Sequence, residues 1–349
     1  MGGAFQRILI VKLSSLGDVV HALPVPVSLR ATFPKARLAW VIEKKWLPLV
    51  ARHPDLDAVY TVDSLGLRQK PHRWSGLWTD LRQVQEFGPD CALDLQGTVK
   101  SAVVCRRSGA AVRIGFAGQA LRERMASFAY NRHVRPQAEH VVDQMLGLAA
   151  AVDPGTPFRY ERRFPFAIPA AVQSEVDQWI RENRIGPFAF FSPGGGWASK
   201  RWPSERYAAL AENLEREFGL SAVLNRGPDE RYIDDTYRRA SMIRARIFSG
   251  DVEHLGAVLR RARLVVGGDT GPLQLAAALN LPTVALFGPT DPARNGPYSD
   301  QCLVIRKPTK TTYHRSSTYS PSMLAITPEE VAAACGQLLT ATPPIQMTP

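Results

Sequence analysis

A glycine-rich turn near residue 268 constrains the fold of this chain more than any other segment. Residues 264–268, Leu-Val-Val-Gly-Gly, predict a buried strand, and Asp269, Thr270 and Gly271 lead from it into a helical pattern. Such a turn is an anion site, because free backbone N–H groups and the helix dipole both point at it. The glycines alone could serve only to make a tight turn. A second strand, 283–287, also ends in a glycine turn, which favours a phosphate-bearing ligand.

Short apolar runs and helical patterns alternate along the whole chain. This alternation predicts parallel βαβ units and therefore an α/β fold with doubly wound sheets. A chain of 349 residues exceeds one ordinary core, so two domains are expected. We expect a first domain over residues 1–165, a second over 166–325, and a last helix and tail over 326–349.

Polar residues follow several of the predicted strands. In open α/β sheets, ligands bind beyond the carboxyl ends of the strands. Residues far apart in sequence could therefore converge on one site, namely Asp18, Gln96, Lys200, Asp229 and Thr270.

The charge of the chain is unevenly distributed. Residues 1–165 hold 23 Lys and Arg against 14 Asp and Glu, whereas residues 166–349 hold 20 against 18. A basic half suggests an acidic partner. Because no nucleic-acid motif is present, an anionic lipid-linked substrate at a membrane surface fits better than a nucleic acid. A merely solvated basic surface remains the alternative.

Nothing in the sequence predicts a membrane span, a signal peptide or a zinc site. No apolar run approaches the roughly 20 residues that cross a bilayer. The first residues lead directly into a predicted strand, so a cytoplasmic location is expected. The four cysteines are scattered and show no CxxC spacing, which indicates neither zinc nor a disulfide framework.

Asp18 is the first candidate for chemistry, since it stands in the turn after the first predicted strand. An aspartate there can cap the following helix, or it can act as a general base on a sugar hydroxyl. A helix N-terminus lowers the pKa of a carboxyl, so proton transfer to such a base would occur late in the reaction.

Lys200 is the second candidate, because it follows three glycines and precedes another cation, Arg201. A fixed lysine can neutralise the charge of a departing nucleoside diphosphate without a metal. It could equally belong to a solvent-facing basic turn. The close acidic pairs, Asp55 with Asp57 and Asp234 with Asp235, are interpreted as surface acids, so neither a metal site nor a cofactor is expected.

Several segments in order along the chain resemble the type I lipopolysaccharide heptosyltransferases of glycosyltransferase family 9. They are Arg-Ile-Leu-Ile-Val-Lys-Leu-Ser-Ser-Leu-Gly-Asp at 7–18, Ala-Trp-Val-Ile-Glu at 39–43, Leu-Asp-Leu-Gln-Gly-Thr-Val-Lys-Ser at 93–101, Tyr-Asn-Arg at 130–132, Gly-Asp-Thr-Gly at 268–271 and Phe-Gly-Pro-Thr-Asp at 287–291. The resemblance covers nearly the whole chain.

This resemblance implies a GT-B fold, with two facing Rossmann-like domains and a last helix that crosses back to the first. It also implies an inverting, metal-independent transfer of L-glycero-D-manno-heptose from ADP-heptose to a 3-deoxy-octulosonic acid (Kdo) residue of the lipid A-linked inner core. The enzyme would then be peripheral on the inner face of the inner membrane and would not bind nucleic acid. Its oligomeric state is not implied.

The resemblance also assigns roles to residues. Asp18 and Lys200 match the catalytic base and the lysine that holds the donor phosphates. The implied donor-binding residues are Ser192, Gly194, Gly195, Lys200, Asp229, Asp269, Thr270, Gly271 and Gln274. The implied acceptor-binding residues are Ser14, Ser15, Gly17, Arg68, Arg73, Gln96 and Arg122.

Two segments depart from the family pattern. Gln274 stands where the family usually has histidine, so a role that needs an imidazolium is not available there. Residues 194–199 lack the usual threonine of the family's loop. The alternatives are therefore a transferase of the same fold with another nucleotide sugar or acceptor, or a sugar-nucleotide 2-epimerase.

Overall fold

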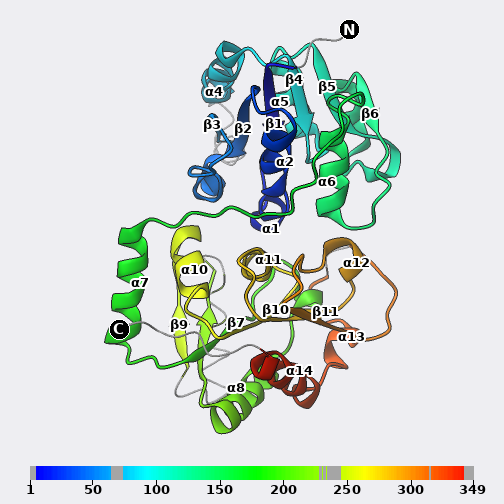
Figure 1. Cartoon of the computed structure of the whole chain (residues 1–349). Helices are drawn as coiled ribbons and strands as arrows, with labels where there is room; N and C mark the ends of the chain where they lie inside the picture. Colours follow the sequence, from blue (N-terminus) through cyan, green and yellow to red (C-terminus); the bar gives the residue numbers. More distant parts are fainter. Residues whose placement is uncertain are drawn as a thin grey trace. The chain divides into compact units, whose positions relative to one another are not determined.

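Each half of the chain folds around a six-stranded, all-parallel sheet. The computed structural model describes residues 5–63, 74–227, 230, 233, 245–313 and 316–341. It divides into two compact units, Met1–Ala167 and Ile168–Pro349 (Figure 1). The division falls close to the expected boundary at residues 165 and 166.

The two sheets have the same topology. The first runs in the order β3-β2-β1-β4-β5-β6, with strands β1 Arg7–Val11, β2 Arg37–Glu43, β3 Ala58–Val62, β4 Cys91–Asp94, β5 Val112–Phe116 and β6 Arg132–Val134. The second runs in the order β12-β11-β10-β7-β8-β9, with strands β7 Phe188–Ser192, β8 Ser221–Asn225, β9 Arg246–Phe248, β10 Leu264–Gly268, β11 Thr283–Phe287 and β12 Cys302–Arg306. Counted within its own unit, each sheet has the strand order 3-2-1-4-5-6 of the Rossmann fold.

Helices connect the strands in both units. Those of the first unit are α1 Leu16–Val20, α2 Pro24–Thr32, α4 Trp74–Phe87, α5 Val99–Arg107 and α6 Val141–Ala150, with 3-10 helices η1 Lys44–Leu49, η3 Gly118–Ala120 and η4 Arg124–Ala129. Those of the second are α7 Ala170–Glu182, α8 Ser204–Phe218, α10 Val252–Leu259, α11 Gly271–Ala278, α12 Pro292–Asn295, α13 Pro321–Leu324 and α14 Pro328–Ala341, with the 3-10 helix η5 Ala198–Lys200.

The central strands are buried along their length, as expected for parallel strands covered by helices. Strands β4, β7, β10 and β11 consist of buried residues only. Each unit has its own apolar core, which includes Leu9 and Val41 in the first and Phe191 and Val266 in the second. The two units therefore bury apolar surface independently, and each can hold its own strand-end turns in place.

The structure divides one predicted helix. The helical pattern over about 19–32 predicts a single helix, whereas α1 ends at Val20 and α2 begins at Pro24. Proline has no N–H to continue the helical ladder and is favoured at a helix start, so the chain turns between the two.

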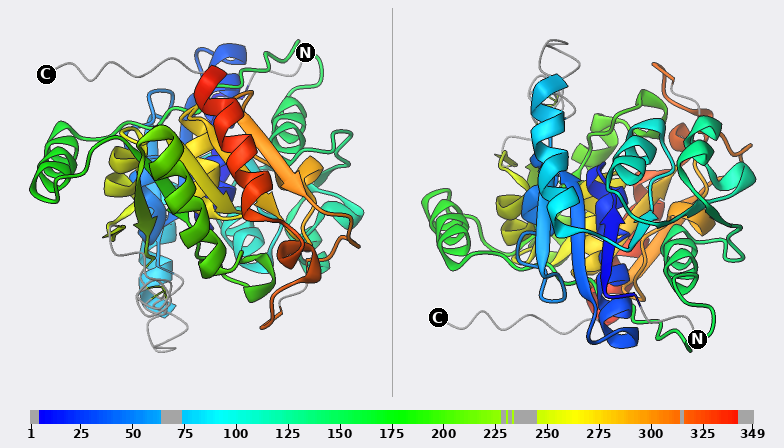
Figure 2. Two further views of the ribbon diagram at one scale, coloured as in Figure 1. Left: turned by 90° about the horizontal axis from the view of Figure 1, so that it is seen from below. Right: turned by 90° about the horizontal axis from the view of Figure 1, so that it is seen from above.

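The last helix lies on the second sheet. Helix α14 belongs to the second unit. Its buried Val331, Cys335 and Leu338 recur at helical spacing and pack in the second core. Figure 2 shows α14, in red, beside α8, in green. Burial of this apolar stripe fixes the helix on its own unit.

Candidate active site

The candidate residues cluster at the switch point of each sheet. In the Rossmann strand order, connections leave in opposite directions from the two central strands, which opens a crevice at their carboxyl ends. In the first unit these strands are β1 and β4, which lead to Asp18 and to Gln96. In the second they are β7 and β10, which lead to Lys200 and to Asp269. Sheet topology thus brings together, within each unit, turns that are far apart in sequence.

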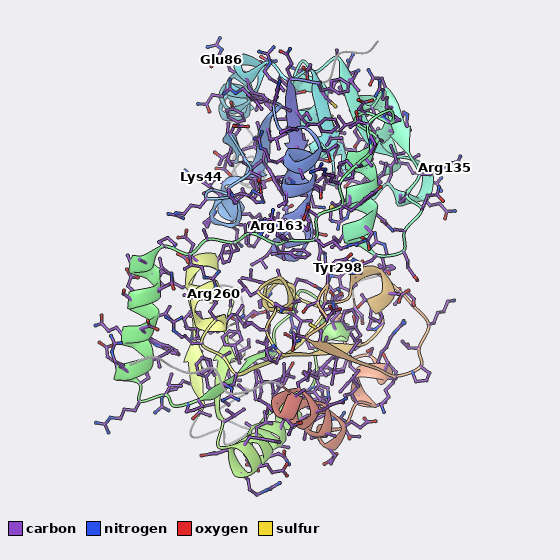
Figure 3. The ribbon with its side chains drawn as sticks, in the orientation of Figure 1. Lys44, Glu86, Arg135, Arg163, Arg260 and Tyr298 are labelled. Carbon is purple, nitrogen blue, oxygen red and sulfur yellow. The ribbon has the colours of Figure 1, made fainter. Side chains whose placement is uncertain are left out.

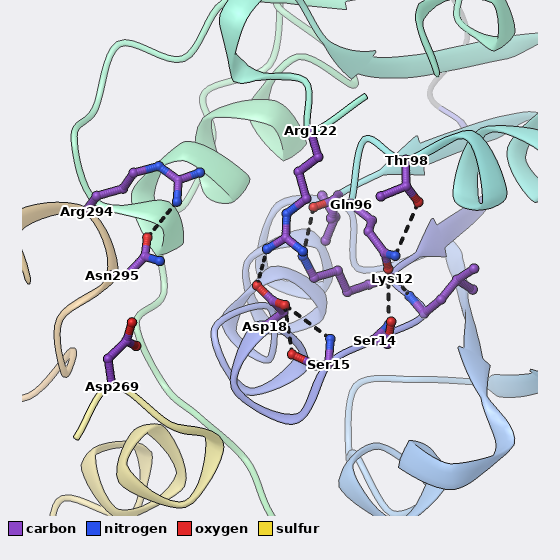
Figure 4. A network of polar contacts seen from close by, with 12 residues as sticks. Lys12, Ser14, Ser15, Asp18, Gln96, Thr98, Arg122, Asp269, Arg294 and Asn295 are labelled. Atoms are coloured by element: carbon purple, nitrogen blue, oxygen red, sulfur yellow. Dashed lines mark hydrogen bonds and ion pairs between the residues drawn. The ribbon is translucent and has the colours of Figure 1, made fainter. Parts of the chain in front are cut away.

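Asp18 is the third residue of helix α1 and accepts hydrogen bonds at both carboxylate oxygens. The backbone N–H and the hydroxyl of Ser15, the N-cap residue, donate to Oδ2 at 3.2 Å and 3.0 Å. The Arg122 guanidinium donates to Oδ1 at 2.5 Å (Figure 4). Asp18 is therefore not the helix cap but the partner of the cap, and 20% of its side chain is exposed.

Opposing effects act on the pKa of Asp18. Burial raises the pKa of this carboxyl, but the positive charges of Lys12 and Arg122, together with the hydrogen bonds from Arg122 and Ser15, outweigh burial and lower the pKa well below its usual range. Lys12 is itself buried, and its ammonium donates to the Leu95 carbonyl at 3.1 Å. The structure thus holds Asp18 as a carboxylate over the physiological pH range.

Gln96 fixes the backbone that carries Asp18. Its side-chain oxygen accepts from the backbone N–H groups of Leu13, at 2.7 Å, and Ser14, at 3.1 Å (Figure 4). Its amide nitrogen lies 3.3 Å from the Thr98 hydroxyl and donates to it. The side chain is buried, so it joins the turn after β4 to the turn after β1.

Asp94 and Tyr130 support this junction, and the sequence did not single them out for a role. Asp94 is fully buried and accepts from the backbone N–H groups of Gln96, at 2.8 Å, and Gly97, at 3.1 Å. The Tyr130 hydroxyl donates to its other oxygen at 2.7 Å. Burial raises the pKa of Asp94, and these hydrogen bonds offset part of the effect. The position of Asp94 at the end of strand β4 was the available signal for this residue. Tyr130 comes from a distant segment.

In the second unit, Lys200 pairs with Asp269. The ammonium lies 2.5 Å from Oδ2, and the two side chains are only 16% and 11% exposed. The same ammonium lies 4.3 Å from the centre of the Trp197 ring, within cation–π range. Lys200 is thus not a freely solvated basic residue, because its charge is held at the end of β10.

Glu230 organises the triple-glycine loop. One of its carboxylate oxygens accepts from the Gly195 N–H and the other from the Gly227 N–H, both at 2.9 Å. A Cβ at Gly194 would collide with this carboxylate, so a side chain there would displace Glu230 from the loop. The sequence indicated Asp229 instead, which lies outside the described residues. A carboxylate beside such a loop can accept hydrogen bonds from ribose hydroxyls.

The turn after β10 leads into helix α11. Thr270 is the N-cap residue, and its hydroxyl lies 3.3 Å from that of Ser192 at the end of β7. Gly271 begins the helix, so its first N–H groups lack partners within the helix. Two hydroxyls, a lysine and a helix N-terminus therefore lie on adjacent strand ends, a suitable combination for a phosphate.

Gln274 has a different setting from the other donor candidates. Its side chain is 3% exposed, and its amide donates to the Asn295 backbone carbonyl at 2.8 Å. This bond ties helix α11 to α12, which carries Arg294. Gln274 thus holds neighbouring backbone in place.

The remaining candidates differ in what the structure says of them. Ser14 contributes its N–H to the turn, and Gly17 lies within helix α1. Arg68 and Arg73 lie outside the described residues.

Within the part of the chain that is described, no group of three His, Cys, Asp or Glu residues could hold a metal ion, and no helix there is long and apolar enough to cross a membrane.

Two Rossmann-type sheets in one chain, each with polar residues at its switch point, are the architecture of GT-B glycosyltransferases. The model of glycosyltransferase family 9 (heptosyltransferase) matches residues 76–322, more than half of the chain. The chain belongs to this family and is a glycosyltransferase.

Individual relatives match almost the entire chain. Lipopolysaccharide heptosyltransferase 1 of Pseudomonas aeruginosa is 30% identical, over 91% of this chain and 89% of its own length. The structure of the ADP-heptose lipopolysaccharide heptosyltransferase II of Escherichia coli has a TM-score of 0.77 at 24% identity, over 96% and 99% of the two chains. The E. coli heptosyltransferase WaaC with ADP-2-deoxy-2-fluoro heptose has a TM-score of 0.74 at 25% identity, over 95% and 99%. The GT-B fold expected from the sequence is confirmed.

Proposed function

We propose that this chain transfers L-glycero-D-manno-heptose from ADP-heptose to Kdo of the lipopolysaccharide inner core. The observation that carries the proposal is the Asp18 carboxylate, held ionised beside Arg122 at the end of β1. The 30% identity to a lipopolysaccharide heptosyltransferase 1 supports this acceptor. The WaaC structure with a fluorinated ADP-heptose supports the donor.

The proposed reaction is a single inverting displacement without a metal. The acceptor hydroxyl attacks the anomeric carbon of heptose from the face opposite ADP. Its proton passes to Asp18 as the new glycosidic bond forms and the bond to the phosphate oxygen breaks. Because the pKa of Asp18 is low, this proton moves late, when the attacking oxygen has become acidic. ADP leaves with both electrons of the broken bond.

The second unit is proposed to bind the donor. Lys200 and the N-terminus of helix α11 would stabilise the charge that develops on ADP. The turns next to these groups also belong to the proposed donor site, through Ser192, Gly194, Gly195, Asp269, Thr270 and Gly271. The carboxylate of Asp229 or Glu230 would meet the ribose. Gln274 would act indirectly, since its amide is committed to Asn295.

The first unit is proposed to bind the acceptor. Arg122, together with Arg68 and Arg73, would meet its carboxylates and phosphates, while Ser14, Ser15, Gly17 and Gln96 shape the turn around Asp18. The excess of 23 basic over 14 acidic residues in 1–165 suits such an acceptor. The proposed location, on the inner face of the inner membrane, follows from a lipid-linked acceptor.

The test measures ADP release with purified lipid A-linked Kdo acceptor for the wild type, Asp18→Asn and Lys200→Ala. We expect Asp18→Asn to lower turnover about 100-fold or more while ADP still raises its melting temperature. Lys200→Ala should lower the turnover and also reduce the rise in melting temperature that ADP causes. Near-normal turnover of Asp18→Asn at saturating substrates would exclude the mechanism. Replacing ADP-heptose by UDP-sugars tests another donor, and product formed without acceptor would indicate the epimerase.

A further inference from the structure

We propose that the outward face of 3-10 helix η4, with the arginines beside it, docks this chain onto an anionic phospholipid bilayer. Helix η4 spans Arg124–Ala129, in the first unit. The inference deepens the proposed function, because it assigns a surface to the encounter with a lipid-linked acceptor. In an ordinary surface helix the large apolar side chains face the core, whereas in η4 they face the solvent.

The outward side chains of η4 are large and apolar. Met125 is 74% exposed and Phe128 is 58% exposed, the highest values among the large apolar side chains of the described residues. In a 3-10 helix, residues three apart lie on the same face, so these two side chains share one side. Ala126 and Ala129, on the other side, are fully buried in the first core. Two small residues thus hold the helix down while two large ones project into solvent.

Several contacts hold the backbone of helix η4 in place. The Arg113 guanidinium donates to the Ala129 carbonyl at 2.7 Å. Ser127, on η4, has its hydroxyl 3.0 Å from the His133 ring nitrogen of β6. Helix η4 also packs against α5. Because the backbone that carries the two exposed apolar side chains is held in place, binding costs little backbone conformational entropy, as expected for a docking surface.

The charge around η4 fits an anionic surface. The segment 122–135 contains four arginines and one glutamate, Glu123, which is committed to the backbone N–H of Val99 at 2.7 Å. Arg124 adjoins Met125, and both Arg124 and Arg135 are exposed. Arg135 extends outward from the ribbon in Figure 3. Apolar side chains flanked by arginine match a bilayer surface, where the former enter the headgroup region and the latter meet phosphates.

The docking surface is continuous with the acceptor half of the site. Arg122, which contacts Asp18, stands two residues before η4. The Glu123 N–H donates to the Gly97 carbonyl at 3.1 Å, so the same segment is fixed on the turn that carries Gln96. Docking through η4 would therefore hold Asp18 near the membrane surface from which a lipid-linked acceptor projects.

The experiment measures co-sedimentation of the full chain with vesicles of phosphatidylglycerol and phosphatidylethanolamine, and with neutral phosphatidylcholine vesicles. No donor or acceptor is present, so this test can fail independently of the proposed function. The docking variant is Met125→Ser with Phe128→Ser. The control variant is Tyr160→Ser with Leu324→Ser, which removes one exposed aromatic and one exposed aliphatic side chain elsewhere.

We expect the wild type and the control to bind anionic vesicles and to bind neutral ones more weakly. The docking variant should bind anionic vesicles about tenfold more weakly at an unchanged melting temperature, because it loses apolar burial and not core packing. Arg124→Glu with Arg135→Glu should lower binding to anionic vesicles and its dependence on salt. Unchanged binding of the docking variant, or an equal loss in the control, would overturn the proposal. So would failure of the wild type to bind anionic vesicles, an outcome that would favour a protein partner for this face.

Discussion

At the level of single residues, the Arg122 guanidinium has two competing partners. Its guanidinium donates to Asp18 in this structure, and the proposed function also requires it for an acceptor carboxylate. An acceptor that takes over Arg122 would remove one of the charges that lower the pKa of Asp18. The carboxylate would then become a stronger base when the acceptor is present, which couples acceptor binding to proton transfer.

The pH dependence of kcat/KM tests this coupling. The pKa of Asp18 in the folded protein is lowered, so its carboxylate stays ionised below about pH 4, the usual range of an aspartate. The acid limb of the profile, where kcat/KM falls as the pH decreases, should therefore lie below that pH. Arg122→Ala removes a positive charge and a hydrogen bond, so the acid limb should move to higher pH. Arg106→Ala, at an exposed position of α5, serves as the control. An acid limb that stays in place in Arg122→Ala would exclude the coupling.

Tyr130 is predicted to stabilise the turn beneath the site. Tyr130→Phe removes the donor to the buried Asp94 carboxylate and should lower the free energy of unfolding by about 1–3 kcal/mol. Urea unfolding measures the change. Tyr60→Phe, at a half-buried position of β3, should change it by less than about 0.5 kcal/mol. Equal effects of the two substitutions would argue against a special role for the Tyr130 hydroxyl.

At the level of elements, β10 and its turn are held by close backbone contact. A Cβ added at Gly268 would lie 2.7 Å from the Lys200 carbonyl oxygen. Lys200 belongs to η5, so this contact sets the separation of the two segments that form the donor half of the site. A side chain at Gly268 therefore displaces backbone, whereas a side chain at a nearby glycine with open space around it need not.

Gly268→Ala and Gly196→Ala form a matched pair. We expect Gly268→Ala to lower the free energy of unfolding by about 1–3 kcal/mol, since the backbone of 200 or 268 must shift. A Cβ at Gly196 meets no heavy atom within 4 Å, so Gly196→Ala should remain within about 0.5 kcal/mol of the wild type. Thermal or urea unfolding of both variants checks the difference. A neutral Gly268→Ala would show that this contact adapts without cost.

At the level of the whole molecule, the two units have separate sheets and cores, so ligand effects should be separable. We expect ADP to slow amide hydrogen exchange in residues 192–200 and 268–274, because bound phosphates stabilise those turns. Residues 13–18 and 94–98 should exchange as in the free protein. Protection of the first unit alone would contradict the assignment of the donor to the second.

Much of the fold could be predicted from the sequence because its signals are local. The runs at 188–191 and 283–287 are apolar and β-rich, and both form strands. Strand β6 was not predicted because its three residues are exposed or half-buried and form no apolar run. Strand β12 was missed although residues 302–305, Cys-Leu-Val-Ile, form a short apolar run. The break between α1 and α2 was also missed, although Pro24 provided a signal.

The candidate site could be predicted only in part. Asp18, Lys200 and Thr270 stand beside glycines at strand ends, and such turns can be recognised from short segments. Glu230 was not predicted, since sequence alone does not show that its carboxylate accepts from the backbone N–H of Gly195. The exposed pair on η4 had no signal either, because burial of Ala126 and Ala129 depends on the surrounding core.

The sequence by itself determined the alternation of strands and helices, the division into two units, and the glycine, aspartate and threonine of the strand-end turns. These follow from backbone preferences and apolar periodicity within a few residues. Tertiary structure decided the partners. Arg122, in the segment after β5, meets Asp18 across 104 residues, and Lys200 meets Asp269 across 69. The first sheet sets β1, β4 and β5 side by side, and the second sets β7 beside β10. Those pairings arise from strand order and burial, which only the folded sheets supply.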